Sequence, residues 1–440
     1  MNMHPQFGIT PPAEPRDVQD TGLSAVMMRD IALKTIFRTN LTLQSDIARA
    51  IALPAPVTDC LIDSLRKQNL LEALGNFSTV ASPEMRFQLT DIGRARALDA
   101  LAQSEYFGAM PVPLTEYAAQ IRRQSVRKIK ISRADLIAAM GHLILPEDLI
   151  THLGPAVSSG RSILMYGPPG NGKSSISNGI RAAMGDLIYV PRAIEYLGQV
   201  ISVFDPIVHS PAQAAPSLAQ DEISLRRTGP RHDPRYVLCQ RPTIVTGGEL
   251  TLDMLDLKFN PVARTYQAPL QLKASGGIFI VDDLGRQAES PQKLVNRWIV
   301  PLEEGRDILQ LQSGEKFTVP FDTLVLFSTN FHPNEIFDGA ALRRIFFKIK
   351  IDGPNQEMFL KILAMVARKK GMALDEESVL YLLREKYPAI GNTFANYQPN
   401  FLIDQIIAIC DFEALPYRMT PSLIDRAWAN MVLRDEVIAK

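Results

Sequence analysis

Apolar positions recur with a helical period at both ends of this 440-residue chain, and strand-like apolar runs lie between them. Near the N-terminus the pattern predicts three amphipathic helices, then two short strands around a polar turn, then one more helix. Thr42 is placed to cap the second helix, and Thr90 to cap the last one. The expected elements are helices at 23–38, after Thr42 and at 57–68, strands at 70–74 and 85–89, and a helix after Thr90.

This order of elements resembles a winged-helix domain, which we assign to residues 21–108. Residues 1–20 are rich in proline, and we expect them to be disordered. Winged helices often bind DNA, yet residues 1–110 carry ten Lys and Arg against twelve Asp and Glu. A surface that binds phosphates should be positive. A protein-contacting or packing role is therefore favoured, and DNA binding stays the alternative.

Residues 109–140 concentrate positive charge, and we interpret them as a basic helical linker. The linker is expected to be solvated or packed on an acidic neighbour, with contact to a nucleic acid as the alternative. Its basic residues are Arg122, Arg123, Arg127, Lys128, Lys130 and Arg133.

Short β-rich runs then alternate with helical patterns or long insertions. This alternation is typical of an α/β fold with a parallel sheet, which we assign to residues 141–352. Residues 353–440 have only a helical period and predict a separate small helical domain, whose last helix opens at Thr420 and Pro421. The expected strands are 162–166, 187–190, 277–281, 323–327 and 346–351.

The most specific motif follows the first of these strands and fits the phosphate-loop pattern G-x-x-x-x-G-K-[ST]. Glycines let backbone N–H groups surround phosphates, and the next helix presents its positive N-terminal end. Lys173 then reaches the outer phosphates, and Ser174 is a ligand for Mg²⁺. The sequence therefore predicts that the chain binds a nucleoside triphosphate. The candidate binding residues are Gly167, Pro168, Pro169, Gly170, Asn171, Gly172, Lys173, Ser174 and Ser175.

Polar side chains also end two later strands. Asp282 and Asp283 follow the apolar run 277–281, and Asn330 follows the run 324–327 with two hydroxyl residues between. The carboxyl ends of parallel strands face the phosphate loop, so Asp282 is expected to hold Mg²⁺ through water. Asp283 is expected to orient or polarise the attacking water.

The order of phosphate loop, acidic strand end, strand-terminal Asn, paired arginines and helical lid resembles the AAA+ ATPase family. A hairpin expected at residues 308–317, before the strand that ends at Asn330, and the segment 273–277 are similar to the MoxR-like and enhancer-binding branches. The resemblance implies a P-loop NTPase fold whose cofactors are ATP and Mg²⁺. It implies that Lys173 and Ser174 are Walker A residues, Asp282 is the Walker B magnesium ligand and Asn330 is sensor 1.

The same resemblance implies that Arg344, with Arg343 beside it, is an arginine finger. Such a finger reaches the nucleotide of a neighbouring subunit, so a homo-oligomeric ring, often a hexamer, is expected. Structural ion pairs are the alternative role for both arginines. The segment around residues 145–150 lies where the family holds adenine. The long interval 190–273 is either an insertion that projects into a ring pore or toward a partner, or a surface loop.

Two positions depart from the family pattern. Asp283 stands where a catalytic Glu is usual, so hydrolysis could be slow. Asn400 stands where the lid usually supplies an arginine, with Arg418 or Arg426 as substitutes that the sequence cannot choose between.

Composition narrows the function classes only slightly. Lys plus Arg and Asp plus Glu both total 47, which gives no overall signal for nucleic acid or membrane. Cys60, Cys239 and Cys410 are far apart and read as buried reduced thiols. No apolar run is long enough for a bilayer, so no membrane insertion is expected, and a cytoplasmic protein is the simplest interpretation.

The sequence thus favours a ring-forming ATPase that remodels or assembles a protein complex, with the winged helix as adaptor. A DNA-acting motor or regulator is one alternative. A nucleotide-gated scaffold with slow turnover is the other.

Overall fold

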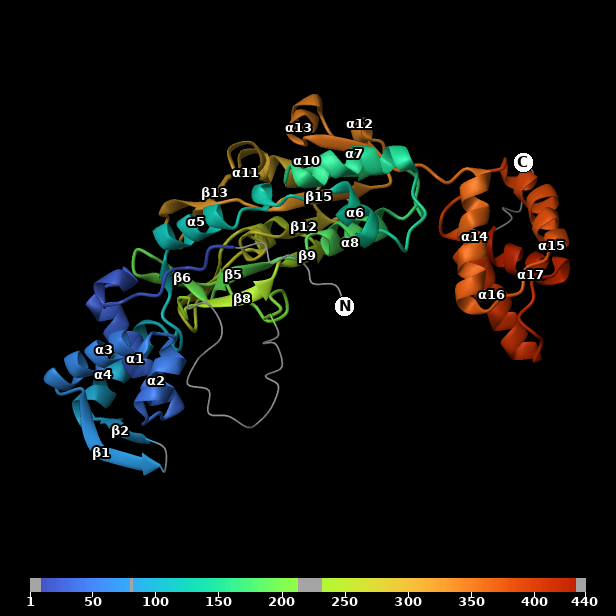
Figure 1. Ribbon diagram of the computed structural model, residues 1–440. Coiled ribbons are helices and arrows are strands. Elements are labelled where there is room, and N and C mark those ends of the chain that lie inside the picture. Colours follow the sequence, from blue (N-terminus) through green and yellow to red (C-terminus); the bar gives the residue numbers. More distant parts are fainter. Residues whose placement is uncertain (1–8, 80–81, 213–231, 433–440) are drawn as a thin grey trace.

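The structure is a computed structural model that describes residues 9–79, 82–212 and 232–432 (Figure 1). An N-terminal helical unit, a central α/β body and a C-terminal helical unit follow one another along the molecule. The α/β body with its parallel sheet, followed by a helical lid, confirms the predicted fold class.

The N-terminal unit has the predicted order of helices and strands, while its membership of the winged-helix family stays a prediction. Thr90 caps α4 as expected, because its hydroxyl accepts from Gly93 N at 3.0 Å. The predicted cap at Thr42 is wrong: α2 begins after Leu43, and the Thr42 carbonyl accepts instead from Phe87 N in β2. The elements are α1 Ala25–Thr39, α2 Gln44–Ile51, α3 Ala55–Lys67, β1 Leu71–Thr79, β2 Ser82–Leu89 and α4 Asp91–Gln103.

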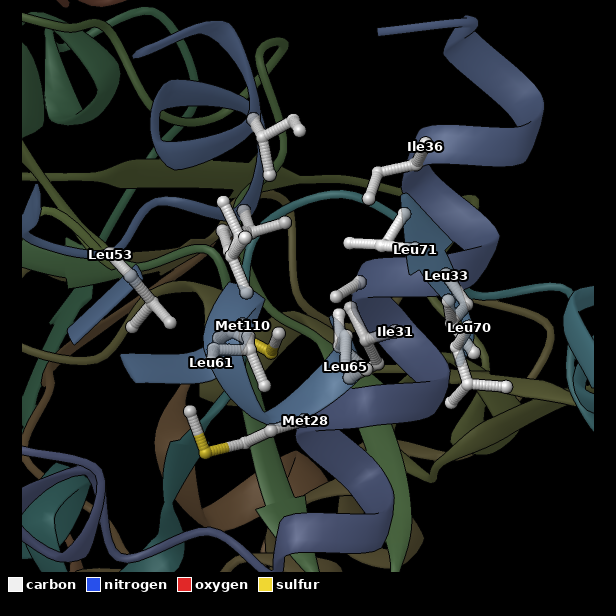
Figure 2. Close-up of a cluster of buried hydrophobic side chains, with 14 of the residues drawn as sticks. Met28, Ile31, Leu33, Ile36, Leu53, Leu61, Leu65, Leu70, Leu71 and Met110 are labelled. Atoms are coloured by element: carbon white, nitrogen blue, oxygen red, sulfur yellow. The ribbon is translucent and has the colours of Figure 1, made fainter. Parts of the chain in front are cut away.

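A single apolar core holds this unit together (Figure 2). Met28 and Ile31 of α1 pack against Leu65 of α3, and Met110 enters from the segment after α4. Each is almost fully buried, and a side chain of this size stabilises the fold by about 1.5–3 kcal/mol when buried.

A buried ion pair fastens the N-terminal unit to the central body. Arg235 and Asp233 pair at 2.8 Å, with both side chains 3% exposed. The Arg235 guanidinium also donates to the carbonyls of Thr21 (2.9 Å) and Pro111 (3.2 Å). The charge of Arg235 is thus satisfied by groups from both parts of the chain.

Residues 9–20 are ordered against this junction, so the predicted disorder of residues 1–20 is wrong for this part; residues 1–8 lie outside the described residues. Asp233 N donates to Pro12 O, and Gln120 Nε2 donates to Thr10 O. Prolines suit this path because an extended chain without its own ladder needs few N–H donors.

The basic linker packs on an acidic neighbour, which was one of the two structural expectations for it. Ser125 Oγ donates to one carboxylate oxygen of Asp322 (2.7 Å) and Val126 N to the other (3.0 Å). Burial of this carboxyl group raises the pKa of Asp322. The elements are β3 Val112–Pro113, α5 Leu114–Arg123, η2 Val126–Lys128 and α6 Arg133–Ala139.

The central sheet is wholly parallel, with the strand order β16-β4-β15-β12-β9. Four of the five strands were predicted. The fifth predicted strand, residues 187–190, is present as β5 (Leu187–Pro191), but its expected place in the parallel sheet is wrong, because it pairs antiparallel with β8 (Tyr236–Gln240). The edge place in the parallel sheet is taken by β9, whose apolar run is only Ile244 and Val245 between two threonines, too short to predict a strand. The strands are β4 Ile163–Tyr166, β9 Thr243–Thr246, β12 Ile278–Val281, β15 Leu324–Thr329 and β16 Phe347–Lys350.

Helices cover both faces of this sheet. Ile163 and Met165 of β4 join one core with α6, α7 and α8, whereas Leu164 joins the other core with α10 and α13. Successive strand residues point to opposite faces, so one strand contributes to both cores. The helices are α7 Glu147–Ser158, α8 Lys173–Ala183, α10 Pro291–Arg297, α11 Ile299–Glu304, α12 Pro333–Ile336 and α13 Gly339–Arg344.

The described part of the interval 190–273 forms most of a second sheet, with the order β10-β11-β7-β6-β3. Residues 213–231 of this interval lie outside the described residues. The predicted hairpin before β15 is present and packs its apolar face on the second sheet. The elements are β6 Ala193–Tyr196, β7 Gln199–Ser202, η3 Leu252–Leu255, β10 Lys258–Asn260, β11 Thr265–Gln267, α9 Leu270–Lys273, β13 Arg306–Gln310 and β14 Lys316–Pro320.

The C-terminal unit is helical and has its own core around Phe359, Tyr387 and Trp428. Thr420 caps α17 and Pro421 opens it, as predicted. The pattern predicts that this helix extends to residue 434, whereas α17 ends at Met431 with Val432 as its C-cap; residues 433 and 434 lie outside the described residues. The elements are α14 Gln356–Lys370, α15 Glu376–Tyr381, η4 Leu382–Lys386, η5 Tyr387–Ile390, α16 Gln398–Glu413 and α17 Pro421–Met431.

Two expectations from composition concern the surface. Cys239 and Cys410 are buried free thiols, but Cys60 is exposed, so its predicted burial is wrong. Cys60 lies on α3, whose inner face is formed by Leu61 and Leu65 instead. None of the helices in the described part of the chain is long and apolar enough to cross a bilayer.

The buried ion pair leads to a stability prediction. Asp233→Ala leaves the Arg235 charge buried without its counter-ion, and we expect a loss of about 3–5 kcal/mol in the free energy of unfolding. Denaturant unfolding of the full chain measures it. Asp46→Ala, which removes an exposed partner of Arg49, is the control and should change stability by less than about 1 kcal/mol. Equal effects of the two substitutions would contradict the role assigned to the buried pair.

Candidate functional site

The phosphate loop connects β4 to α8 at the carboxyl edge of the central sheet. Gly167 and Gly170 have positive φ angles of 142° and 76°. A Cβ at Gly167 would lie 2.2 Å from the carbonyl oxygen of Ile351 in the segment after β16. Glycine is therefore needed here both for the backbone conformation and for the close approach of a neighbouring chain segment.

Lys173, the first residue of α8, folds back over the loop. Its ammonium donates to the carbonyls of Gly167 (2.8 Å) and Pro168 (3.0 Å) and to Asn330 Oδ1 (2.8 Å). Burial lowers the pKa of Lys173, while the charges of Asp282 and Asp283 oppose that shift. The Lys173 ammonium thus lies within the loop, where its positive charge could pair with a bound anion.

Asp282 lies at the end of β12 with its two carboxylate oxygens engaged separately. Oδ2 accepts from Ser174 Oγ at 3.0 Å, and Oδ1 accepts a short hydrogen bond from Ser328 Oγ. Adjacent ligands in an octahedral Mg²⁺ shell of about 2.0–2.1 Å radius lie roughly 2.9 Å apart. The spacing of Ser174 Oγ and Asp282 Oδ2 therefore fits two ligands of one magnesium ion.

Protein carboxylates alone would not complete such a shell. Within the described residues, no group of three or more His, Cys, Asp and Glu side chains could hold a metal ion. Magnesium commonly takes one or two protein oxygens and completes its shell with substrate phosphates and water. The donor set of Ser174 and Asp282 is of this incomplete kind.

Asp283 has a left-handed backbone, with φ at 52°, which is unusual for a residue with a side chain. Its carboxylate accepts from Asn330 Nδ2 at 2.8 Å. Asn330 therefore joins Lys173 to Asp283 through its two amide ends. A strained backbone of this kind stores about 1–3 kcal/mol and is often found where a side chain must be aimed at a reacting group.

The lid closes over this cluster to form a cavity of about 710 Å³. One wall is the phosphate loop with Asp282, Asp283 and Asn330, and the opposite wall comes from α14 and the start of α16. A third wall is the segment before α7, including His142 and Leu145. The volume is that of a typical small-molecule site.

A strap at residues 394–397 ties the lid to the loop. Tyr397 N donates to Gly170 O at 3.0 Å, and Asn396 Nδ2 donates to Asn171 O at 2.9 Å. A Cβ at Gly170 would lie 2.3 Å from the Tyr397 ring. The lid is thus positioned directly by the loop that it covers.

The lid arginines that the sequence offered as substitutes for Asn400 do not line this cavity. Arg418 pairs with Asp375 at 3.3 Å and Arg426 with Glu413 at 2.8 Å, both within the lid. Asn400 itself lines the cavity and donates to Asp404 at 3.0 Å.

A second cavity, of about 520 Å³, adjoins the first between α7, β16 and the start of α14. Leu145, Asn171 and Asn396 line both. The second cavity includes Leu145 and Pro146 of the segment expected to hold a nucleobase, while Ile150 is buried in the core beneath it. The two cavities together have room for a base at one end and phosphates at the other.

Arg343 and Arg344 lie at the other edge of the sheet. Arg344 O accepts from Ser162 Oγ (3.4 Å), just before β4 begins, whereas the phosphate loop follows the end of β4. Four strand residues at about 3.3 Å each separate the two sites. Arg344 pairs with Glu303 at 3.0 Å, and the exposed Arg343 donates to Gly339 O at 3.2 Å.

Sequence reasoning thus anticipated a group of residues that lie together: the phosphate loop, Asp282, Asp283 and Asn330. It missed Ser328, although alternation along β15 places Ser328 and Asn330 on the same side. It also missed Lys369, which lines the cavity from α14, because nothing in a helical repeat marks which face covers a site.

Comparisons with known proteins give limited information. Residues 355–430, most of the lid, match a family described as "Domain of unknown function (DUF8689)". No match was found among curated proteins.

Solved structures resemble the chain at low identity. NtrX from Brucella abortus in complex with ADP is 12% identical with a TM-score of 0.40, over 79% of this chain and 68% of that chain. The same protein in complex with ATP is 14% identical with a TM-score of 0.39, over 76% and 69%. A RuvB mutant from Thermotoga maritima is 13% identical with a TM-score of 0.37, over 66% and 72%. Because these values are low, the P-loop NTPase fold is assigned from the strand order and the place of the phosphate loop.

The close fit of the strap leads to a prediction on Gly170. Gly170→Ala should destabilise the chain by about 2–4 kcal/mol, because a positive φ is strained and the new methyl group displaces the Tyr397 ring. Thermal unfolding and hydrogen exchange of residues 394–400 measure the effect. Gly172→Ala is the matched control. Gly172 has a φ of 88°, but the nearest atom to a Cβ there would be 3.8 Å away, so this variant should lose stability only through the strained backbone. Unchanged exchange in the strap of Gly170→Ala would contradict the packing described here.

Proposed function

We propose that this chain is an ATPase that binds ATP with Mg²⁺ and hydrolyses it within a ring of identical subunits. The observation that carries the proposal is the joining of Lys173, Asn330 and Asp283 by hydrogen bonds, beside the oxygens of Ser174 and Asp282. Phosphoryl transfer requires this combination of a phosphate grip, a metal-ligand pair and a group that orients the nucleophile.

In the proposed reaction the Lys173 ammonium leaves the loop carbonyls and binds the outer phosphates, which replace those carbonyls as acceptors. Asp283 accepts a hydrogen bond from the attacking water and orients the oxygen of that water toward the terminal phosphorus. Asn330 fixes the carboxylate of Asp283 and the ammonium of Lys173 relative to one another.

Ser174 and Asp282 would hold Mg²⁺, which supplies neutralisation of the phosphate charge when bound. The strained backbone of Asp283 supports its proposed role, because its carboxylate is one methylene shorter than that of Glu. The altered backbone direction offers one way to reach the water despite that length.

The ring is supported by the separation of the two edges of the sheet. Arg344 cannot reach the phosphate loop of its own chain, since it starts from the amino edge of β4. A head-to-tail ring joins two different surfaces of neighbouring subunits, and the proposed ring sets the amino edge of one subunit against the nucleotide of the next. Arg344 then stabilises charge on the transferring phosphate of the neighbour, and Arg343 is exposed beside it.

The proposed task of the ring is to remodel or assemble a protein partner. The N-terminal unit is fastened to the central body through Arg235, just before β8, so movements of the body would pass to it directly. Its negative balance of charge supports contact with a protein more than contact with DNA. A salt-dependent shift of labelled DNA by the full chain would favour the DNA-acting alternative.

Substitution of Lys173 tests the binding of ATP. Lys173→Ala removes the cation that neutralises the outer phosphates, and we expect binding of labelled ATP in the presence of magnesium to fall by at least about 100-fold. Equilibrium binding by filter retention or calorimetry measures it. Lys361→Ala, which alters an exposed helical ion pair of the lid, is the control and should bind as the wild type does. Wild-type protein that retains no ATP would overturn the proposed function itself.

Substitution of Arg344 tests the rate of ATP hydrolysis. Arg344→Ala should lower the ATPase rate of the oligomer by about 10³–10⁵-fold while leaving ATP affinity unchanged, because the lost charge acts only on the neighbour's transition state. Steady-state phosphate release and a binding isotherm measure the two quantities.

Glu303→Ala separates a finger from a structural ion pair. It breaks the same 3.0 Å contact but leaves the charge of Arg344 in place. Retained turnover in Glu303→Ala, with turnover lost in Arg344→Ala, supports the finger. Equal losses in both variants would assign Arg344 to structure. Tight ATP binding without turnover in the assembled wild type would favour the slow scaffold that Asp283 suggested.

A further inference from the structure

The lid helix α14 presents one face to the cavity above the phosphate loop. Ile362, Met365, Val366 and Lys369 all line it, at spacings of three, one and three residues. Such spacing places the four side chains on a single side of a helix. In Figure 1, α14 is the lid helix nearest the central body. Three apolar residues and one cation of α14 therefore line the same cavity as the phosphate loop.

Lys369 is the one cationic residue that the described part of the lid contributes to this cavity. Three other cationic side chains of the lid already have acidic partners: Lys370 pairs with Asp404, Arg418 with Asp375 and Arg426 with Glu413. Lys369 is exposed, and no hydrogen bond or ion pair to another described residue engages it. Its ammonium is therefore available to a ligand in the cavity.

The rest of the lid wall carries no competing charge. Asn400, at the start of α16, donates to Asp404, and Asp404 in turn is neutralised by Lys370. Asn396 and Tyr397 contact the loop through amide and backbone groups. An anion held by Lys173 on one side would thus meet a single cation on the other.

We propose that Lys369 binds the terminal phosphate of the nucleotide, so that the lid recognises a triphosphate through α14 rather than through α16. The proposal rests on the proposed ATP-binding function and assigns a residue within that site. When the Lys369 ammonium binds this phosphate, it would draw α14 toward the loop. The strap at residues 394–397 is hydrogen-bonded to the loop and would guide that movement. A diphosphate lacks the group that Lys369 contacts.

The test compares ATP and ADP affinities of the full-length chain in the presence of magnesium. A hydrogen bond to a charged group contributes about 1.5–3 kcal/mol, which corresponds to roughly 10–100-fold in affinity. Lys369→Ala should weaken ATP binding by that factor while changing ADP binding less than about threefold. Lys369→Arg keeps the charge and should restore ATP binding to within about threefold of wild type.

Arg368→Ala is the matched control, because Arg368 is an exposed cation one residue away that does not line the cavity. It should leave both affinities unchanged. Thermal unfolding of every variant excludes loss of the folded lid as the cause. Unchanged ATP affinity in Lys369→Ala, or equal losses for ATP and ADP, would overturn the assignment. Wild-type protein that binds neither nucleotide would instead overturn the proposed function on which it rests.

Discussion

Asn330 accepts a hydrogen bond from Lys173 and donates one to Asp283, and the candidate site depends on these two bonds because they join three adjacent strand ends of the central sheet. The phosphate loop follows β4, Asn330 follows β15 and Asp283 follows β12, and these strands are neighbours in the order β4-β15-β12. Parallel strands bring their carboxyl ends to one edge, so groups more than a hundred residues apart meet without a long connecting loop. The chemistry of the site is therefore a consequence of strand order.

The same geometry divides functional groups between two edges. The groups that follow β4, β12 and β15 gather around the cavity, whereas Arg344, which precedes β16, is held at the opposite edge beside Ser162. A single chain thus holds a phosphate grip and a distant arginine that cannot meet. This separation is the physical reason for proposing that a neighbouring subunit completes the site.

The N-terminal unit and the lid are attached to the central body in different ways. The buried ion pair of Arg235 and Asp233, just before β8, fixes the N-terminal unit to the body, since a guanidinium held by carbonyls of Thr21 and Pro111 leaves little freedom. The lid is connected more lightly, through backbone and amide hydrogen bonds of Asn396 and Tyr397 to the loop. A change at the phosphate loop can therefore move the lid while the N-terminal unit follows the body.

The sequence by itself determined the local features: the glycines and lysine of the loop, the caps at Thr90 and Thr420, and the apolar strands that end in Asp282 and Asn330. Each depends on residues a few positions apart, so periodicity and turn chemistry reveal it. Tertiary structure decided the edge strand β9, the sheet in the interval 190–273, the order of residues 9–20 and the cavity face of Lys369. These depend on contacts between distant segments, because an exposed edge strand or helix face has the same local pattern wherever it packs.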